Sequence, residues 1–358
     1  MNEEKKMILD MLKEGKITVE QASDLLEAVG KDKNKNNDDN FINKLSQSFE
    51  SIMKKTSEKL SNIDIDFDIN DLNIPSNLFN INATAKESQI KIDDDINEIS
   101  LDITNGSFEI ERSQESSIIV DQKVFFKNKE DVEKDYLSID VVDDRLEIKL
   151  NETYKTLNAR PEIKLYLGKN IYDKLYINLV NGDVEICDVD FRENIISTTN
   201  VKTTIINSSG NVEIDNTNGK IELRNTNGNL NINNVNGPIY LTNVSGDVAN
   251  IEVINGAIRS DGFNIDTLNA STNVGSVKFS KLGDSKDIKI RTQFGSVTID
   301  TENVDKEIKA FLNAPSYHIS EKFKNKLQKN GGYEVSTNPE IADLDIEVTT
   351  RFGSASIQ

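Results

Sequence analysis

The sequence predicts a mainly β protein in which a long C-terminal part forms a β-solenoid of about 18–20 residues per coil. The first observation is a repeat, because five nonamers follow one another from residue 207, each with Asn first and Gly fourth. The second is a change from helical to two-residue periodicity near residue 61. The third is composition: 6% aromatic residues and no Trp suit a thin, aliphatic interior.

Residues 1–30 predict a helical hairpin. Apolar residues recur at helical spacing up to Gly15, which suits a helix C-terminus, and a capping-box pattern then begins at Thr18. So short a hairpin buries little by itself, so we expect its apolar stripe to contact another copy or another protein. A folded cap without a partner is the alternative. The expected interface consists of Ile8, Met11, Leu12, Leu25 and Leu26.

Residues 31–40 are all polar and predict a flexible linker, and residues 41–60 predict an amphipathic helix. This helix has a net charge of +2, whereas residues 61–358 together have a net charge of −18. A basic amphipathic helix can lie on an anionic membrane surface, and packing against the β domain or in a coiled coil is the alternative. The expected partner or membrane contacts are Phe41, Leu45, Phe49, Ile52, Met53, Lys54, Lys55 and Lys59.

Residues 61–84 predict a linker that contains a strand segment. From Ile63 to Ile69 apolar residues alternate with Asp64, Asp66 and Asp68, which places the three carboxylates on one face of a strand. A calcium loop of the EF-hand type would need Gly at its sixth position, and counting from Asp64 that position is Ile69. We therefore interpret the carboxylates as a solvated face.

The nonamers predict the stacking of the solenoid. Two nonamers make one natural coil, so that like residues recur every 18 residues and lie above one another. Antiparallel hairpins at the Asn-Gly pairs are the alternative, but a meander does not need this register. We expect two columns of stacked amides, one of Asn207, Asn225 and Asn243 and the other of Asn216 and Asn234. The second, sixth and eighth positions should face inward: Thr217, Ile221, Leu223, Thr226, Leu230, Ile232, Val235, Ile239 and Leu241.

The whole repeat domain is expected to span residues 85–358, with an interruption near 313–334. Pro315, His318 and a Lys-rich stretch break the pattern there. We expect a loop or short helix that projects from the solenoid, as a solvated insertion rather than a binding site.

Residue types that carry familiar chemistry are scarce. A single Cys and a single His leave no thiolate or imidazole cluster for zinc. Glu185 and Asp188 flank Cys187, and their negative charge raises the pKa of a thiol, whereas catalysis requires a lowered one. We therefore expect no catalytic residues, no metal, no cofactor and no enzyme activity. The net charge of −19 argues against nucleic acid as a partner.

Two stretches carry a resemblance to a known family. Gly15-Lys16-Ile17-Thr18 begins a run that is similar to the short N-terminal helical modules of bacterial envelope-stress proteins, and the coils show G-x-[VIL]-x-[VIL]. The chain thus resembles the bacterial putative-adhesin family with β-strand repeats, and in particular its LiaX/YvlB-like members from Gram-positive bacteria. Gly168 stands where these proteins often have Pro.

The resemblance implies a non-enzymatic protein of the cell-envelope stress response. In this interpretation the acidic solenoid binds cationic ligands such as antimicrobial peptides, and the helical module binds a protein partner or the membrane surface. A self-assembling structural or adhesive surface protein, a homo-oligomer, is the alternative, and a β-helix carbohydrate-active enzyme ranks third. The first residues lack a signal-peptide pattern, so we expect a cytoplasmic protein, with peripheral association with the cell envelope as the alternative.

Overall fold

The computed structural model describes residues 84–169, 171–329 and 331–358. The expected hairpin at 1–30, the linker at 31–40, the amphipathic helix at 41–60 and nearly all of the segment at 61–84 lie outside these residues. The described residues form two compact units, one of residues 84–235 with 240–248 and one of residues 236–239 with 249–358.

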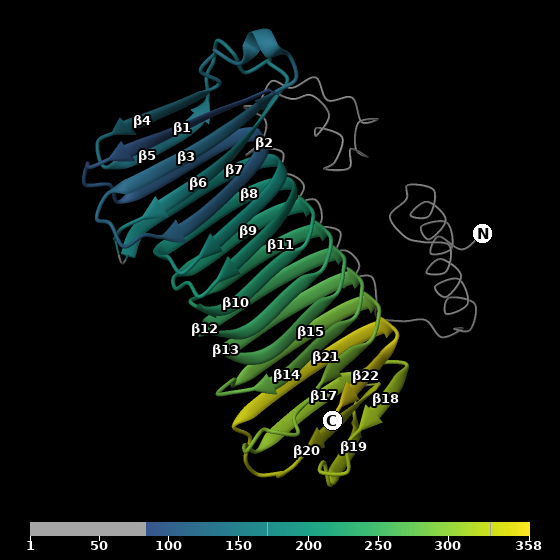
Figure 1. Cartoon of the computed structure of the whole chain (residues 1–358). Helices are drawn as coiled ribbons and strands as arrows, with labels where there is room; N and C mark the ends of the chain where they lie inside the picture. Colours follow the sequence, from purple (N-terminus) through teal and green to yellow (C-terminus); the bar gives the residue numbers. More distant parts are fainter. Residues whose placement is uncertain (1–83, 170, 330) are drawn as a thin grey trace, which may run out of the picture. The chain divides into compact units, whose positions relative to one another are not determined.

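The described residues are almost entirely strands (Figure 1). In chain order these are β1 (Thr84–Ile92), β2 (Glu98–Arg112), β3 (Ile118–Phe126), the 3-10 turn η3 (Lys129–Asp131), β4 (Leu137–Val142), β5 (Arg145–Leu150), β6 (Ala159–Leu167), β7 (Ile171–Cys187), β8 (Asp190–Ile206), β9 (Asn211–Asn218), β10 (Ile221–Asn227), β11 (Leu230–Asn236) and β12 (Ile239–Asn255). They continue with β13 (Ile258–Val274), β14 (Val277–Leu282), β15 (Asp287–Phe294), β16 (Val297–Ile299), β17 (Ile308–Asn313), β18 (Ser316–Ile319), β19 (Asn325–Lys329), β20 (Gly332–Ser336), β21 (Leu344–Phe352) and β22 (Ser354–Ile357).

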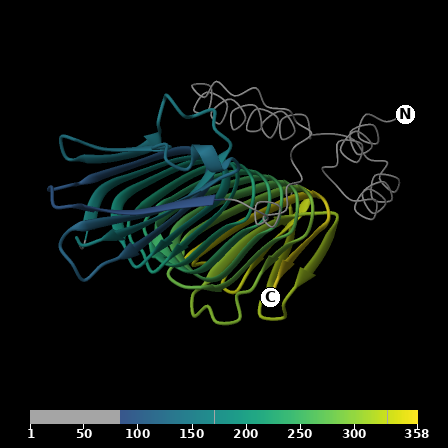
Figure 2. The same cartoon turned by 45° about the horizontal axis from the view of Figure 1, so that its top comes forward.

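Successive coils pair in parallel at the predicted period. In the first unit Glu193 of β8 pairs with Asn211 of β9, 18 residues on. In the second, Thr267 of β13 pairs with Asp287 of β15, 20 residues on. Figure 2 shows the same stacking of coil on coil from a second direction. The β-solenoid prediction is confirmed in both units, and the antiparallel meander is wrong for the repeats.

The pairing becomes antiparallel where the repeats stop. In the first unit β3 pairs antiparallel with β1 and β6, and β4 with β5. In the second unit β20 pairs antiparallel with β17 and β19. Residues 313–334, expected as a loop or short helix, therefore hold strands β18 and β19. That expectation was wrong because β18 continues a coil by pairing with β22.

The C-terminal coil is inserted between two earlier coils. β21 pairs in parallel with β15 on one side and with β17 on the other, and β22 lies in the same way between β16 and β18. Figure 1 shows the yellow strand β21 among green strands. Strands that are consecutive in the sequence are thus separated in space.

The interior is thin and mostly aliphatic, as predicted. Of the nine expected inward positions, all are buried except Thr217, which is half-buried. Thr217 follows the fully buried Asn216, as the buried Val235 follows the fully buried Asn234, so the neighbouring amide does not explain the difference. Where aromatic residues enter the second unit they stack between coils, as Phe294 does on Phe352 with ring centroids 5.0 Å apart.

The first predicted amide column lies at an exposed corner. Asn225 donates to Asn207 (2.8 Å), Asn243 donates to Asn225 (3.1 Å), and Asn207 continues the column by donating to Asp188 (2.9 Å). All four residues have a positive φ, between 50° and 58°. Asn and Asp tolerate this left-handed conformation better than other residues with a Cβ, so the corner explains the residue type.

The second predicted column is buried. The amide of Asn216 accepts from the Thr198 hydroxyl (3.0 Å) and donates to Asn234 (3.2 Å) and to the Val201 carbonyl (3.4 Å). Asn234 in turn donates to the Gly219 carbonyl (3.0 Å). These contacts satisfy polar groups that would otherwise be buried without a partner.

A third column was not predicted. Asn181 donates to Asn105 (2.8 Å), Asn200 to Asn181 (2.8 Å) and Asn218 to Asn200 (2.7 Å). These residues precede the next corner, where Gly219 has a φ of 140° and a Cβ would lie 2.0 Å from the Val201 carbonyl oxygen. The sequence signal for this column is an Asn before a Gly, which holds for Asn105, Asn181 and Asn218.

We predict that Asn216→Ala destabilises the protein by about 2–3 kcal/mol, because it leaves a hydroxyl, a carbonyl and an amide buried without partners. Urea denaturation followed by circular dichroism measures the change. Asn231→Ala removes the same side chain at an exposed position and should change stability by less than about 0.5 kcal/mol. Equal effects of the two substitutions would contradict the role of the buried column.

At the exposed corner we predict that Asn225→Ala destabilises by about 2 kcal/mol, since Ala both loses the amide contacts and strains at positive φ. Asn225→Gly loses the same contacts without the strain and should cost about half as much. The urea denaturation midpoints of the Ala and Gly variants, each compared with that of the unaltered protein, measure the two effects. An Ala variant as stable as the Gly variant would mean that backbone conformation does not select Asn here.

Candidate functional site

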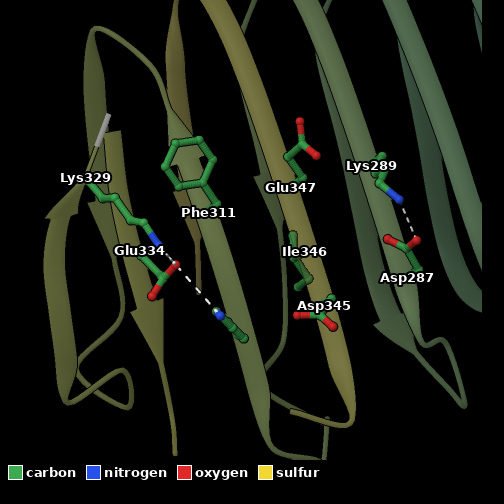
Figure 3. Close-up of a pocket in the computed structure, with 9 residues that line it drawn as sticks. Asp287, Lys289, Phe311, Lys329, Glu334, Asp345, Ile346 and Glu347 are labelled. Atoms are coloured by element: carbon green, nitrogen blue, oxygen red, sulfur yellow. Dashed lines mark hydrogen bonds and ion pairs between the residues drawn. The ribbon is translucent and has the colours of Figure 1, made fainter. Parts of the chain in front are cut away.

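The outer face of the second unit is hollowed into a groove of about 540 Å³. Its floor is made by β15, β21, β17, β20 and β19, which include the inserted strand β21 and its two neighbours β15 and β17. The lining residues are Asp287, Lys289, Lys309, Phe311, Lys329, Glu334, Asp345, Ile346 and Glu347. Figure 3 shows them on their strands.

The strand register sets two rows of side chains across this floor. In the first row Asp345 of β21 lies between Asp287 of β15 and Lys309 of β17. Two carboxylates are therefore direct neighbours, an arrangement that is unfavourable unless cations compensate it.

The second row holds the aromatic ring. Glu347 of β21 lies between Lys289 of β15 and Phe311 of β17, and Phe311 is followed by Glu334 of β20. In Figure 3 the ring of Phe311 lies beside Glu347, with Asp345 further along the same strand. Phe311 is half-buried, so part of its surface is open to the groove.

Ion pairs satisfy three of the four carboxylates. Lys289 contacts Asp287 (2.6 Å), Arg291 contacts Glu347 (3.1 Å), and Glu334 is contacted by Lys329 (3.4 Å) and Lys309 (3.8 Å). In the part of the chain that the structure describes, no ion pair or side-chain hydrogen bond involves the Asp345 carboxylate.

The arrangement suits a cationic group. An exposed carboxylate without a partner attracts a positive charge, and the face of a nearby aromatic ring adds to that attraction. The three lining lysines can hold an acidic or carbonyl group of the same ligand. The groove can therefore bind, but its carboxylates are spread over three strands of an open sheet.

Sequence reasoning did not find this groove. Its lining residues come from four separate stretches between residues 287 and 347, which only the inserted coil brings together. Two of them, Lys329 and Glu334, fall in the stretch at 313–334, which was expected to be a solvated insertion. One sequence signal for the groove was available. The pattern D-I-x-[IV] occurs at both Asp287 and Asp345, and these two residues pair with each other in the neighbouring strands β15 and β21.

A second pair of carboxylates lies in the first unit. Glu109 and Glu111 stand two residues apart on β2 and share a hydrogen bond. The hydrogen bond from Lys164 lowers the pKa of Glu109, and the hydrogen bond with Glu109 raises the pKa of Glu111. Neither Glu109 nor Glu111 lines the groove, so these two carboxylates are not part of the candidate binding site.

Cys187 lies at the end of β7 and is half-buried. Burial, and after it the negative charge of the Glu185 carboxylate 3.6 Å from the sulfur, together raise the pKa of its thiol to about 11. This agrees with the expectation from the flanking acids. At neutral pH the thiol is protonated and is a weak nucleophile.

The other expected sites divide into two groups. The amide columns are found as described above. The hairpin contacts Ile8, Met11, Leu12, Leu25 and Leu26 and the helix contacts between Phe41 and Lys59 lie outside the described residues. Within residues 84–358, apart from 170 and 330, no group of three or more His, Cys, Asp or Glu side chains is placed to hold a metal ion. No described helix is long and apolar enough to span a membrane.

Parallel coils joined by Asn columns define a β-solenoid. A family model described as Toastrack matches residues 96–357, and the chain belongs to this family, DUF4097. A model described as a SHOCT-like domain matches residues 3–34. The family match agrees with the resemblance to β-repeat adhesin-like proteins, whereas the LiaX/YvlB-like assignment stays a prediction. No curated protein matches the chain.

Several solved structures are similar to the chain at low identity. A "putative adhesin" from Bacteroides fragilis NCTC 9343 is 12% identical, with 77% of this chain and 97% of that chain covered and a TM-score of 0.33. One from Parabacteroides merdae ATCC 43184 is 12% identical, with 76% and 96% covered and a TM-score of 0.39. A "putative lipid binding protein" from Parabacteroides distasonis ATCC 8503 is 13% identical, with 76% and 97% covered and a TM-score of 0.33.

We predict that Cys187 reacts with iodoacetamide far more slowly at pH 8 than a cysteine in a short peptide, and that the rate rises steeply with pH toward about 11. Glu185→Gln removes a negative charge next to the sulfur, lowers the pKa and should speed alkylation several-fold. Glu193→Gln, on the neighbouring strand, is the control and should leave the rate unchanged. Alkylation of the native protein at the peptide rate would contradict the raised pKa.

Proposed function

We propose that this protein is a non-enzymatic binding protein of the bacterial cell-envelope stress response, in which the acidic solenoid engages cationic ligands such as antimicrobial peptides. The observation that carries the proposal is the unpaired Asp345 carboxylate in a groove with an accessible Phe311 ring. The net charge of −18 over residues 61–358 adds a long-range attraction for cations, which salt should screen.

In this proposal the N-terminal part of the chain passes the binding of a ligand on to a partner protein or to the membrane. The SHOCT-like match at residues 3–34 supports a separate small module before the solenoid. The module, through its hairpin contacts, binds a protein partner, and the basic helix at 41–60 binds that partner or an anionic membrane surface. Ligand on the solenoid then changes how these helices associate, and the protein is peripheral to the envelope.

The groove supports binding over catalysis. Glycoside hydrolysis needs two carboxylates held across a bound sugar, one of them protonated. In the groove three carboxylates contact a lysine or an arginine, and the fourth, that of Asp345, is exposed and unpaired among the residues that the structure describes. This arrangement suits a bound cation better than a pair of carboxylates that acts on a sugar.

We predict that a fluorescein-labelled lysine-rich amphipathic peptide binds the full chain at 20 mM salt and that affinity falls at 300 mM salt. Asp345→Asn should weaken binding about fivefold, since it removes the unpaired charge. Asp247→Asn removes an equal charge at an exposed position in the other unit and should leave affinity within about twofold. Fluorescence anisotropy measures all three proteins. No salt-sensitive binding by the unaltered protein would end the proposal.

The site of action is tested on intact producing cells. Added protease should cleave a protein that meets cationic peptides outside the membrane, while a cytosolic protein remains whole as the control. Full protection of both would instead place the solenoid inside, where its partner would be a regulator at the inner membrane surface.

A further inference from the structure

Two features remain outside this binding role. One is β19, an edge strand of the second unit that pairs only with β20 among the described strands. The other is the acidic alternating stretch at residues 63–69, which the sequence singled out and which precedes the described part of the chain. The β19 edge carries lysines and the stretch at 63–69 carries aspartates, so the two have opposite charges.

The free edge of β19 presents a different kind of side chain on each face. Leu327 lies opposite Glu334 of β20 and therefore faces the groove side, and it is 65% exposed, the largest value among the exposed hydrophobic side chains that the structure describes. Lys326 lies opposite Val335 and faces the other way. A strand added here would meet an apolar side chain on one face and a cation on the other.

The cations of this edge are available. Lys324 and Lys326 are exposed, and no ion pair within the described ranges involves either of them. Lys329 differs because it contacts Glu334 (3.4 Å), and Lys322 differs because it donates to the Thr301 carbonyl. Lysines on an edge prevent it from pairing with a second copy of itself, but they favour a strand that carries carboxylates.

Residues 63–69 have that pattern. Apolar residues alternate with Asp64, Asp66 and Asp68, so that a strand of this sequence has one apolar and one acidic face. With Ile65 opposite Leu327 in an antiparallel pair, Asp66 comes opposite Lys326 and Asp68 opposite Lys324. Both faces then match at once.

We propose that residues 63–69 of one molecule add as a strand to the free edge of β19 in a second molecule. We take a second copy as the source of the strand, and the cross-linking experiment below distinguishes it from the same molecule. Such a contact joins two different surfaces, so it builds rings or chains rather than a closed two-fold dimer. It requires no ligand in the groove.

Sedimentation velocity of the full chain over a range of concentrations tests the proposal. The unaltered protein should associate, and both Asp64→Lys/Asp66→Lys/Asp68→Lys and Lys324→Asp/Lys326→Asp should raise the dissociation constant about tenfold or more. An equimolar mixture of the two variants should associate again, because the charges of one now complement the other. Lys202→Asp/Lys278→Asp, a reversal at two exposed lysines elsewhere, should behave like the unaltered protein.

Disulfide trapping distinguishes the source of the strand. In a Cys187→Ser background, a mixture of one protein with Ile65→Cys and another with Leu327→Cys should form a covalent heterodimer on mild oxidation. A protein carrying both substitutions that cross-links only within itself would overturn the second-copy proposal. So would a monomer at every concentration with no cross-linked product in the mixture.

Discussion

The structure depends on hydrogen bonds that join buried polar groups at the coil corners to the next coil. Parallel coils repeat the same corner about every 4.8 Å, so an unsatisfied group in one coil would be unsatisfied in all of them. In the first unit Asn216 and Asn234 make these bonds through side-chain and carbonyl contacts. In the second unit Thr272, Thr292 and Thr350 donate to the carbonyls of Gly256, Gly275 and Gly295.

The side chain that makes the buried corner contact is Asn in the first unit and Thr in the second. An amide both donates and accepts, so it links side chains along a column of identical coils. In the second unit each hydroxyl instead contacts the backbone of the neighbouring coil, whatever its sequence distance. Thr350 contacts Gly295 across 55 residues of sequence as readily as Thr292 contacts Gly275 across 17. Amide contacts also join stretches far apart in the sequence, since Asn181 donates to Asn105 across 76 residues, so both kinds of contact are compatible with coils that are not consecutive.

The inserted coil also creates the groove. It places Asp345 beside Asp287 and Glu347 beside Phe311, pairs that lie 58 and 36 residues apart in the sequence. Lys289, Arg291, Lys309 and Lys329 neutralise the surrounding carboxylates and leave Asp345 without a partner. The same end of the unit holds the β19 edge, where unpaired lysines discourage self-pairing. Binding in the groove and strand addition at the edge use different residues and are separable by substitution.

The sequence by itself determined the repeat architecture. The nonamer register, the inward aliphatic positions and the two Asn columns follow from local rules, because residues 18 apart must meet when each coil contacts only the next. The direction of the pKa shift of Cys187 also follows from its neighbours Glu185 and Asp188, although its largest cause is burial in the folded protein. The third column, Asn105 to Asn218, was present as Asn before Gly and could have been found in the same way.

Only the tertiary structure decided what happens where the repeat stops. Pro315, His318 and the Lys-rich stretch in 313–334 indicated a loop or short helix, yet β18 forms because β22 is available as its partner. The groove has no signature of its own, since its charges come from distant stretches that look solvated one by one. Local periodicity specifies contacts between consecutive coils, whereas an inserted coil is selected by the packing and hydrogen bonding of the whole unit.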